Sequence, residues 1–500
     1  MCDPDESDKH ATTIGTLPDD VLLGIFDFCR MDEDNAIHCA IHCLQDWNSS
    51  WNLWKWHLLA HVCRRWRQII FASARRLNLR IPCTWRTPVR KNLGIWPAFP
   101  IDVEFALHSD VPHEDNILAA FKHLDRVCHI RLTLADSQVG KMVTVMQEPF
   151  PVLKCLYITS RYWCEGVTTL PAGFLGGSAP SLQAIGLRSI PYPALPTLLS
   201  STRNLVKLDL MNIPKTGYIS PKAMVASLAA LPKLEIFVME FQPYDSRPDR
   251  IGPFPVTRTI LPALTYFVFR GINEYMEDFI GQIDGPRLNH ISITTLYRPV
   301  GFQVAQLSRF IDHSVGSKLA QCKHAEVYFS HRFLYRTVTF NFSHRPHDAG
   351  QDRTTIISYE GIDWKATPMS QVLSQLPVTF SNVVHLRIKC SPEKYPSVYD
   401  SLGWVVGWLP LFRQFPNMQT LFVPSQVSGY VSMVLGHITE VKMTEALLSL
   451  ELLCLEKHCP QNIHLDKFIT ARRHSDRPVI AVSTIEEFSE RLESYMSKNE

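Results

Sequence analysis

The stretch Leu17-Pro18-Asp19-Asp20-Val21-Leu22-Leu23-Gly24-Ile25-Phe26 begins the first clear structural element of this sequence. Proline suits the first turn of a helix, where its missing N–H needs no partner, and aspartates there face the positive end of the helix dipole. Apolar residues then recur at the spacing of one helix face. These residues are Val21, Leu22, Ile25, Phe26 and Cys29. The stretch therefore predicts an amphipathic helix.

A second apolar stripe lies between residues 58 and 70, with basic residues interleaved. Its members are Leu58, Leu59, Val62, Cys63, Trp66, Ile69 and Ile70. Their spacing again predicts a helix with one apolar face. Two such stripes can be buried against each other or against a partner protein.

Together the two stretches resemble the F-box, the short helical motif that docks substrate receptors onto SCF-type ubiquitin ligases. The resemblance rests on Leu-Pro-x-x-Val-Leu-x-x-Ile-Phe at 17–26 and Val-Cys-Arg-Arg-Trp-Arg-x-Ile at 62–69. The further run Arg-Lys-Asn-Leu-Gly-Ile-Trp-Pro-Ala-Phe-Pro at 90–100 resembles F-box proteins that basidiomycete fungi carry in large numbers. The resemblance implies a motif in which some side chains pack inside and others touch the SCF adaptor. The residues it implies are Leu17, Pro18, Leu22, Ile25, Phe26, Val62, Cys63, Trp66 and Ile69.

The spacing of the two halves departs from the family pattern. Pro18 and Cys63 are 45 residues apart, about twice the usual distance, so the residues from about 31 to 56 form an insert. Loop-closure entropy rises slowly with length, so a domain can accommodate such an insert. It is rich in tryptophan and either forms a helix on the partner face or is extra sequence. This leaves adaptor affinity open.

The insert also holds the one metal-like pattern in the sequence, His38-Cys39-Ala40-Ile41-His42-Cys43. Pairs at i and i+4 lie on adjacent helix faces, and zinc needs about four such ligands. Since no paired ligands occur elsewhere, we interpret the pattern as a helix surface with incidental histidines and expect no metal or cofactor. Glycine-rich phosphate loops, nucleophile elbows and zinc-protease motifs are also absent from the sequence, so we expect no catalytic residues.

Composition describes a folded protein of 500 residues, with 46% apolar and 20% charged residues. The acidic amino-terminal segment lacks an apolar core, and the most apolar window, 403–412, is too short to span a bilayer. We therefore expect a cytoplasmic or nuclear protein with no membrane contact. The 13 scattered cysteines are most simply buried thiols.

Charge is distributed unevenly although the net charge is only +2. Residues 1–35 contain 10 acidic and 2 basic side chains, whereas residues 55–91 contain 10 basic and none that is acidic. The two segments either neutralise each other or suit a charged adaptor. The alternative is a nucleic-acid patch, which we do not favour because charge alone gives no base readout.

One apolar pattern returns from about residue 101 to residue 460. It consists of an apolar residue, two others, an apolar residue, one other and a third apolar residue. The first series is Val127-Ile130-Leu132, Leu153-Leu156-Ile158, Leu182-Ile185-Leu187, Leu205-Leu208-Leu210, Leu234-Phe237-Met239, Leu264-Phe267-Phe269 and Leu288-Ile291-Ile293. The second series is Val383-Leu386-Ile388, Met418-Leu421-Val423 and Leu450-Leu453-Leu455. Starting positions in the first series are 23 to 30 residues apart, a period typical of leucine-rich repeats.

The last two apolar residues of each triplet point to the same side of a strand, so stacked units form one continuous core. Between triplets lie helix-compatible returns such as 220–230. The usual asparagine after the strand is absent from most units, and short strands of any α/β protein are the alternative. Residues 322–376 break the period, with strand-like stretches at 325–329 and 338–342. A capping box at Thr484 and Glu487 predicts a terminal helix that covers the end of the array.

We therefore predict an α+β chain with a small helical F-box and an α/β leucine-rich-repeat-like solenoid. Its parts are an acidic disordered tail (1–13), the F-box with its insert (14–81), a proline-rich connector (82–100), the repeat domain (101–480) and a C-terminal helix (481–500). The resemblance implies a non-catalytic substrate receptor of an SCF ubiquitin ligase, which binds the adaptor, through it a cullin scaffold, and a target protein. The alternatives are a repeat scaffold whose F-box is disabled by the insert, and a nucleic-acid-associated protein.

Overall fold

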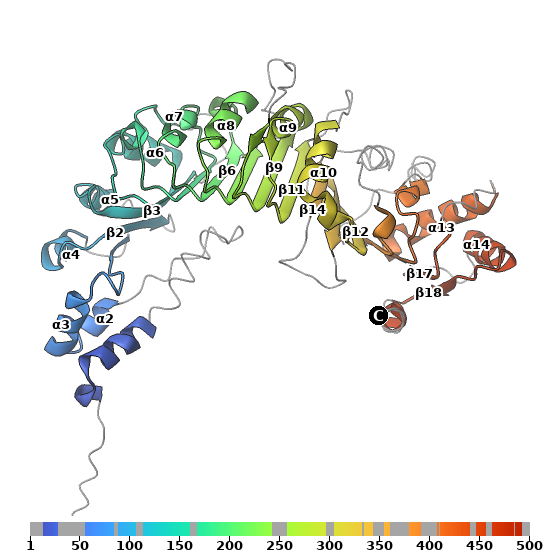
Figure 1. Cartoon of the computed structure of the whole chain (residues 1–500), viewed down its shortest axis with the longest axis horizontal. Coiled ribbons are helices and arrows are strands. Elements are labelled where there is room, and N and C mark those ends of the chain that lie inside the picture. The colour runs from blue at the N-terminus through green and yellow to red at the C-terminus, as the bar shows by residue number, and fades with distance from the viewer. Residues whose placement is uncertain are drawn as a thin grey trace, which may run out of the picture. The chain divides into compact units, whose positions relative to one another are not determined.

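The computed structural model describes residues 14–28, 56–84, 89–106, 114–160, 168–242, 258–296, 305–332, 335–343, 355–360, 380–391, 408–409, 411–440, 447–456, 463–484 and 486–492. The chain divides into two compact units. Unit 1 comprises residues 1–166 and 173–186, and unit 2 comprises residues 167–172 and 187–500. Both are mixed α/β with mainly parallel strands, and Figure 1 labels their elements along the chain.

Unit 1 begins with helical elements and continues with parallel strands. The helical elements are η1 (Ile14–Thr16), a helix over 19–28, α2 (Trp56–Ala60) and α3 (Arg64–Ala72). Strands β1 (Ile81–Thr84), β2 (Ile101–Ala106), β3 (Val127–Leu134) and β4 (Cys155–Ser160) pair side by side in chain order, and β5 (Ala184–Arg188) follows. They are connected through α4 (Val89–Ile95), α5 (Glu114–Ala120), α6 (Asp136–Val145) and η2 (Phe174–Gly177).

The stretch 82–100, which proline spacing marked as a connector, thus contains part of β1 and the whole of α4. Pro82 is accommodated because β1 is the first strand in the sheet order, where a residue without an N–H breaks no ladder between two neighbours.

Unit 2 continues the alternation of strand and helix. Its first half contains α7 (Leu195–Leu199), β6 (Lys207–Ile213), η3 (Lys215–Gly217), α8 (Pro221–Leu228), β7 (Ile236–Phe241), β8 (Thr259–Ile260), β9 (Tyr266–Ile272), α9 (Asn273–Ile280), β10 (Ile283–Asp284), β11 (His290–Leu296) and α10 (Ala305–Leu319). Helices α8, α9 and α10 lie on one face of the strands in Figure 1. The predicted helical return at 220–230 is confirmed as α8, which Ser220 caps by accepting a hydrogen bond from the Ala223 N–H at 3.3 Å.

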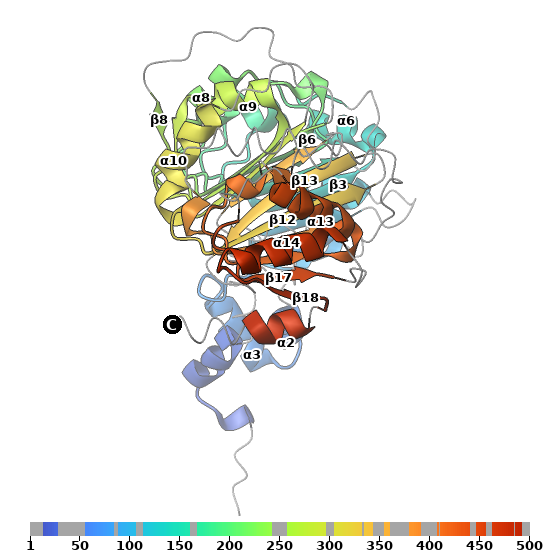
Figure 2. The ribbon, with the colours of Figure 1, turned by 90° about the vertical axis from the view of Figure 1, so that its right-hand side faces the viewer.

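The second half of unit 2 contains β12 (His324–Arg332), β13 (Tyr335–Ser343), β14 (Thr355–Glu360), η4 (Phe380–Asn382), β15 (His385–Cys390), β16 (Thr420–Val423), α13 (Ser425–Glu440), β17 (Leu452–Leu455), α14 (Ile463–His474) and β18 (Ile480–Val482). Helices α13 and α14 pack against each other (Figure 2). They approach closely at Gly436, where an added Cβ would lie 2.7 Å from Nδ1 of His464.

Each of the ten predicted triplets has its last two residues in a strand, and all thirty of their apolar residues are buried. The strands pair in a register that aligns the core positions. Leu208 faces Phe237, Phe237 faces Phe267, and Phe267 faces Ile291. The triplets therefore form the continuous ladders that the repeat pattern predicts, on the sheet face that packs under the helices.

The predicted break in the period is an antiparallel excursion. Strand β12 pairs with β13, and β13 pairs with β14, both antiparallel. The outer strands then rejoin the parallel order, since β14 pairs with β11 and β12 pairs with β15. The described parts of 322–376 thus contribute three strands to the sheet where the repeat pattern would contribute one.

The end of the array is covered as the capping box predicts. Residues 486–492 are helical, and the Glu487 N–H donates a hydrogen bond to Oγ1 of Thr484 at 3.3 Å. Phe488 is buried in a cluster formed by the last strands. The other members are Phe422, Leu452, Cys454 and Val482, with Leu492 packed against them. Of the helices within the described ranges, none is both long and apolar enough to cross a membrane.

Candidate protein-docking sites

The helix over 19–28 is held on α3 by an apolar core inside unit 1. Leu22 and Phe26 lie one turn apart and are fully buried. The Phe26 ring meets the Trp66 ring edge to face, with 5.1 Å between the centroids. Ile69 and Ile70 of α3 are also buried. Burying such side chains stabilises the packed helices by about 1.5 to 3 kcal/mol each.

Two ion pairs fix the ends of the same helix. The Arg65 guanidinium donates to Oδ1 of Asp19 at 2.9 and 2.5 Å and to the Leu17 carbonyl oxygen at 2.6 Å. Arg76 donates to Oδ2 of Asp27 at 2.7 Å. Exposed ion pairs contribute at most about 1 kcal/mol, but these two set the orientation of the helix on α3. The acidic and basic segments therefore neutralise each other in part, which weakens the case for nucleic-acid binding.

Cys63 divides the second stripe into two helices. It is the N-cap residue of α3 in an extended conformation, and its Sγ accepts a hydrogen bond from the Trp66 N–H at 3.4 Å. Because the chain turns here between α2 and α3, Val62 and Cys63 are exposed and do not join the buried face. Leu58 is exposed as well, so the predicted apolar face over 58–70 is not continuous: it is wrong at Leu58, Val62 and Cys63.

The run at 90–100 packs around Trp56, which lies at the end of the predicted insert. Trp56 is buried, and its Nε1 donates a hydrogen bond to the Arg80 carbonyl oxygen at 2.7 Å. The rings of Trp96 and Phe99 meet it edge to face at 5.0 and 5.6 Å. This aromatic cluster joins the helical part of unit 1 to its first strands. The rest of the insert, including His38, Cys39, His42 and Cys43, lies outside the described residues.

The structure separates the nine predicted docking residues into two groups. Leu22, Phe26 and Ile69 are buried, and Leu17 and Trp66 are half-buried. Pro18, Ile25, Val62 and Cys63 are exposed. The first group stabilises the motif, and the second is accessible to a partner.

Further apolar side chains extend the accessible group. Of the thirteen exposed large apolar residues in the described ranges, six lie between residues 14 and 62. Val21, Ile25 and Phe28 are spaced at i, i+4 and i+7, on one face of their helix, and Phe28 is 74% exposed. We call the exposed apolar set the docking set: Ile14, Val21, Ile25, Phe28, Leu58 and Val62. The resemblance missed Ile14, Val21, Phe28 and Leu58, although the helical spacing of Val21 and Phe28 with Ile25 was a readable signal. Exposed apolar groups concentrated in one region indicate a protein interaction site.

A second candidate site lies in unit 2, on the side chains that alternate with the core ladders. Along β6 to β11 the alternating positions include Lys207, Asp209, Glu240, Tyr266 and His290. The Tyr266 and His290 rings stack with 4.2 Å between their centroids. Because successive strand residues point to opposite sides, these groups lie on the sheet face opposite the buried triplets. The sequence alone did not rank these residues, and the strand register identifies them.

The same face continues along β12 and β15. The His324 and His385 rings stack at 4.5 Å, and Nδ1 of His385 lies 2.9 Å from Oγ1 of Thr420. Lys389 forms an ion pair with Glu326 at 2.5 Å. This face of unit 2, which we call the polar face, thus carries hydrogen-bonding, charged and aromatic groups in rows. Lys207, Asp209 and His324 are buried in it, whereas Glu240, Tyr266, His290 and Lys389 are half-buried. Such rows suit a protein ligand better than a small apolar one.

Comparison of the chain with protein-family models and with the curated proteins produced no match.

Proposed function

We propose that this protein is a substrate-recognition subunit of an SCF-type ubiquitin ligase. In this proposal the helical part of unit 1 binds the SCF adaptor, and through it the cullin scaffold, while the repeat strands bind a target protein. The chain itself is a receptor and performs no chemistry, because ubiquitin transfer is the task of other subunits.

The exposed apolar row Val21, Ile25 and Phe28 carries the adaptor part of the proposal. The helix that bears this row is anchored through Leu22 and Phe26 on the adjoining part of its apolar face, so the row is available without unfolding the motif. An amphipathic helix that uses one face for its own core and offers a second apolar face fits a helical partner.

The target part of the proposal is supported by the regularity of the strands in unit 2. Seven of the ten triplets lie in unit 2, where neighbouring parallel strands pair in register, and the side chains of the polar face lie between the core positions. Stacked repeats typically bind partners on an extended surface. We therefore assign target binding to the polar face.

The decisive experiment is co-purification of the full chain with purified SCF adaptor by size exclusion at physiological salt. We expect a one-to-one complex that Ile25→Glu and Phe28→Glu abolish, because each places a charge in an apolar contact. Ile463→Glu is the control, since Ile463 on α14 is an exposed apolar residue outside the docking set. Equal loss with all three variants, or retained binding with the first two, would contradict the docking assignment.

The predicted insert supplies the test of the main alternative. If the wild-type chain forms no complex, deletion of residues 31–55 tells whether the insert blocks a functional F-box or whether the chain has no functional F-box. Binding gained on deletion would indicate a scaffold whose docking motif the insert disables. Absence of binding in both proteins would overturn the receptor proposal. Leu17→Ala combined with Pro18→Ala is expected to abolish adaptor binding while unit 2 stays folded, as judged by circular dichroism.

A further inference from the structure

The polar face changes character at the last three strands of unit 2. Parallel pairing places Arg387 of β15, Phe422 of β16, Cys454 of β17 and Val482 of β18 in one row across the sheet. Paired residues of neighbouring strands point to the same side, so this row continues the polar face, yet its last three members are apolar. Leu452, two residues before Cys454, points to the same side. We call Phe422, Leu452, Cys454 and Val482 the apolar end of the polar face.

The terminal helix of the chain, residues 486–492, lies on the apolar end. Figures 1 and 2 show it beside the label C, on the side of β17 and β18 that faces away from α13 and α14. Phe488 packs on Phe422 with 5.5 Å between the ring centroids, and Leu492 packs against the same cluster. The apolar end therefore accommodates one face of a helix, through side chains four residues apart.

Few contacts hold the terminal helix in place. Among residues 486–492, Phe488 alone is buried, and Glu487 and Leu492 are half-buried. The ion pair of Arg491 with Glu487, at 3.2 Å, lies within the helix and adds nothing to its attachment. A helix of this length is marginal by itself, so it depends on its apolar anchors. Withdrawal of one aromatic side chain is therefore enough to uncover the apolar end.

Arg387, at the border of the apolar end, is incompletely paired. Its guanidinium carbon lies 5.0 Å from the centroid of the Phe422 ring, and its Nε is buried without a hydrogen-bond partner among the described residues. An unpaired buried donor is costly, and a carboxylate is a strong acceptor for a guanidinium.

The terminal helix brings negative charge to this border without satisfying that donor. Burial raises the pKa of the Cys454 thiol to about 12, and the charges of Glu487 and Glu486 add to the rise. The charge of Arg387 opposes it, so the two glutamates and the guanidinium lie around the same thiol. A helix with a carboxylate placed to reach the Arg387 Nε would fit the apolar end better than the terminal helix does.

We propose that the apolar end of the polar face binds an acidic amphipathic helix of the target protein, which replaces the terminal helix. The recognised helix carries an aromatic residue and, four residues later, a leucine, in the pattern of Phe488 and Leu492. Its carboxylate accepts from the Arg387 Nε. The terminal helix is a tethered competitor at high effective concentration, so helices that lack this carboxylate are excluded. The inference rests on the target part of the proposed function and narrows the site to β16, β17 and β18.

The test uses the full chain, with a fluorescein-labelled peptide of residues 483–500 as the probe and fluorescence anisotropy as the measurement. Phe488→Ala in the chain removes the anchor of the tethered competitor. We therefore expect the peptide to bind this variant about tenfold more tightly, or better, than it binds the natural chain. Ser489→Ala, at an exposed position of the same helix, is the matched control and should bind as the natural chain does. A peptide that itself carries Phe488→Ala should not bind.

A second comparison tests the charge of the partner. A peptide whose three glutamates between 486 and 490 are replaced by glutamine should bind the Phe488→Ala chain about fivefold more weakly than the natural peptide. Adding Arg387→Gln to the chain should remove most of this difference. Arg473→Gln, at an exposed position on α14, is the control and should preserve it. An unchanged preference in the Arg387→Gln chain would overturn the acidic class of partner.

Cys454 reports whether the apolar end is uncovered. Its side chain is fully buried, so iodoacetamide should modify it faster in Phe488→Ala, as read by mass spectrometry, and bound peptide should restore its protection. Cys322, which is also fully buried in unit 2 but lies outside the apolar end, should stay unmodified if the fold is intact. Should Phe488→Ala unfold, Leu492→Ala gives the same comparison through the smaller anchor.

Two further results would contradict the proposal. The first is a Phe488→Ala chain with modified Cys454 and protected Cys322 that binds no peptide, because the uncovered apolar end then has no affinity for a helix. The second is a natural chain that elutes as a dimer and becomes monomeric with Phe488→Ala, because the site then joins two copies by exchange of helices. None of these measurements involves the adaptor. A chain that binds adaptor but no peptide loses this site alone, and one that binds peptide but no adaptor keeps it.

Discussion

Asp209 on β6 is a fully buried carboxyl group, and neither of its oxygens has a hydrogen-bond partner. Burial raises the pKa of Asp209 to about 7, and the nearby Glu240 adds to the rise, while Lys207 and Arg188 oppose it. Tyr266 also faces this group, and burial raises its pKa to about 12. At neutral pH the polar face therefore contains an acid that is poised between its neutral and charged forms.

This raised pKa makes the protein less stable as pH rises. Because the folded pKa lies above the ordinary value near 4, the native state holds an extra proton between about pH 4 and pH 7. The stabilising contribution of Asp209 to the free energy of unfolding is complete below pH 4 and is lost as pH rises through 7. We expect Asp209→Asn to remove this loss and to stabilise the chain at pH 8 by about 2 kcal/mol, with little effect at pH 5.

Urea unfolding midpoints at pH 5 and pH 8 measure this effect. The exposed Asp20→Asn serves as the control, with no change expected beyond about 0.5 kcal/mol. An Asp209→Asn protein that unfolds in parallel with the wild type at both pH values would show that the carboxyl is ionised and paired in the native state.

At the scale of elements, the first turn of helix α10 is capped by a side chain of α9. The Glu277 carboxylate accepts hydrogen bonds from the Gln306 and Leu307 N–H groups at 2.8 and 3.0 Å. Glu277 is itself buried, and burial raises its pKa to about 6 against the effect of these bonds. A carboxylate at a helix N-terminus satisfies free amides and interacts favourably with the helix dipole.

Glu277→Ala should therefore loosen the start of α10. Two buried N–H groups lose their acceptor, at a cost of about 2 to 3 kcal/mol. Hydrogen exchange of the Gln306 and Leu307 amides should accelerate, while the half-buried Glu274→Ala on the same α9 helix leaves it unchanged. Unaltered exchange in Glu277→Ala would mean that water or another group replaces the carboxylate.

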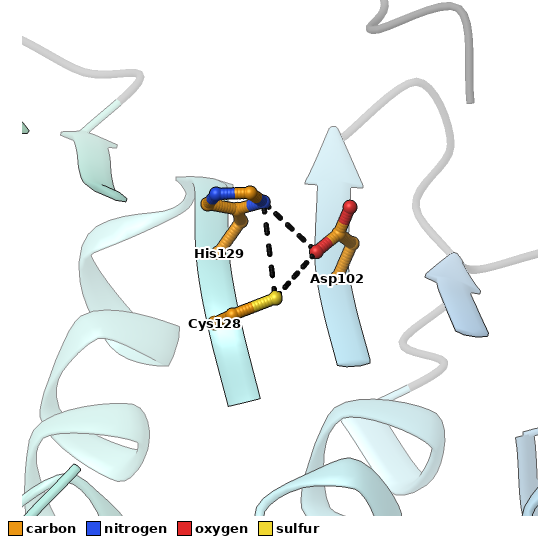
Figure 3. A group of neighbouring side chains, drawn as sticks. All are labelled: Asp102, Cys128 and His129. Carbon is orange, nitrogen blue, oxygen red and sulfur yellow. Dashed lines mark hydrogen bonds and ion pairs between the residues drawn. The ribbon is translucent and has the colours of Figure 1, made fainter. Parts of the chain in front are cut away.

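The elements of the repeat region could be predicted because each triplet has the same local signal, an apolar residue every second position after a fixed offset. Pairing could not. Residues 338–342 indicate a strand by their alternation, but nothing local reveals that β13 runs antiparallel between β12 and β14. The ion pair between Asp102 of β2 and His129 of β3, 2.9 Å between Oδ1 and Nδ1 (Figure 3), was equally hidden. It depends on a one-residue slip in the pairing of these two strands, which no local pattern reveals. At the helices, the spacing did not reveal that Cys63 caps α3.

At the scale of the whole molecule, the core of unit 2 is a ladder of aromatic and aliphatic side chains. Phe267 is fully buried. Its ring centroid lies 5.9 Å from that of Phe237, 6.3 Å from that of Phe279 and 5.7 Å from that of Phe310. In a stacked array each unit touches only its neighbours, so damage should remain local.

Phe267→Ala is expected to destabilise the chain by about 3 to 5 kcal/mol. Hydrogen exchange should accelerate in β7, β9 and β11 but remain unchanged in β16 and β17. Tyr266→Ala, on the polar face of the same strand, is the control and should have a smaller effect. Uniform acceleration over all strands would show instead that unit 2 unfolds as a single cooperative block.

The antiparallel excursion has a consequence for the order in which the protein is made. When the ribosome has released β12, the strand that will lie against β11 has not yet been synthesised, because that place belongs to β14. The nascent sheet therefore has to wait for residues up to 360 before it can grow past β11. Until then β11 and β12 both present open edges, to which another chain can pair. Synthesis of residues 333–360 is thus the interval in which this protein most needs a chaperone.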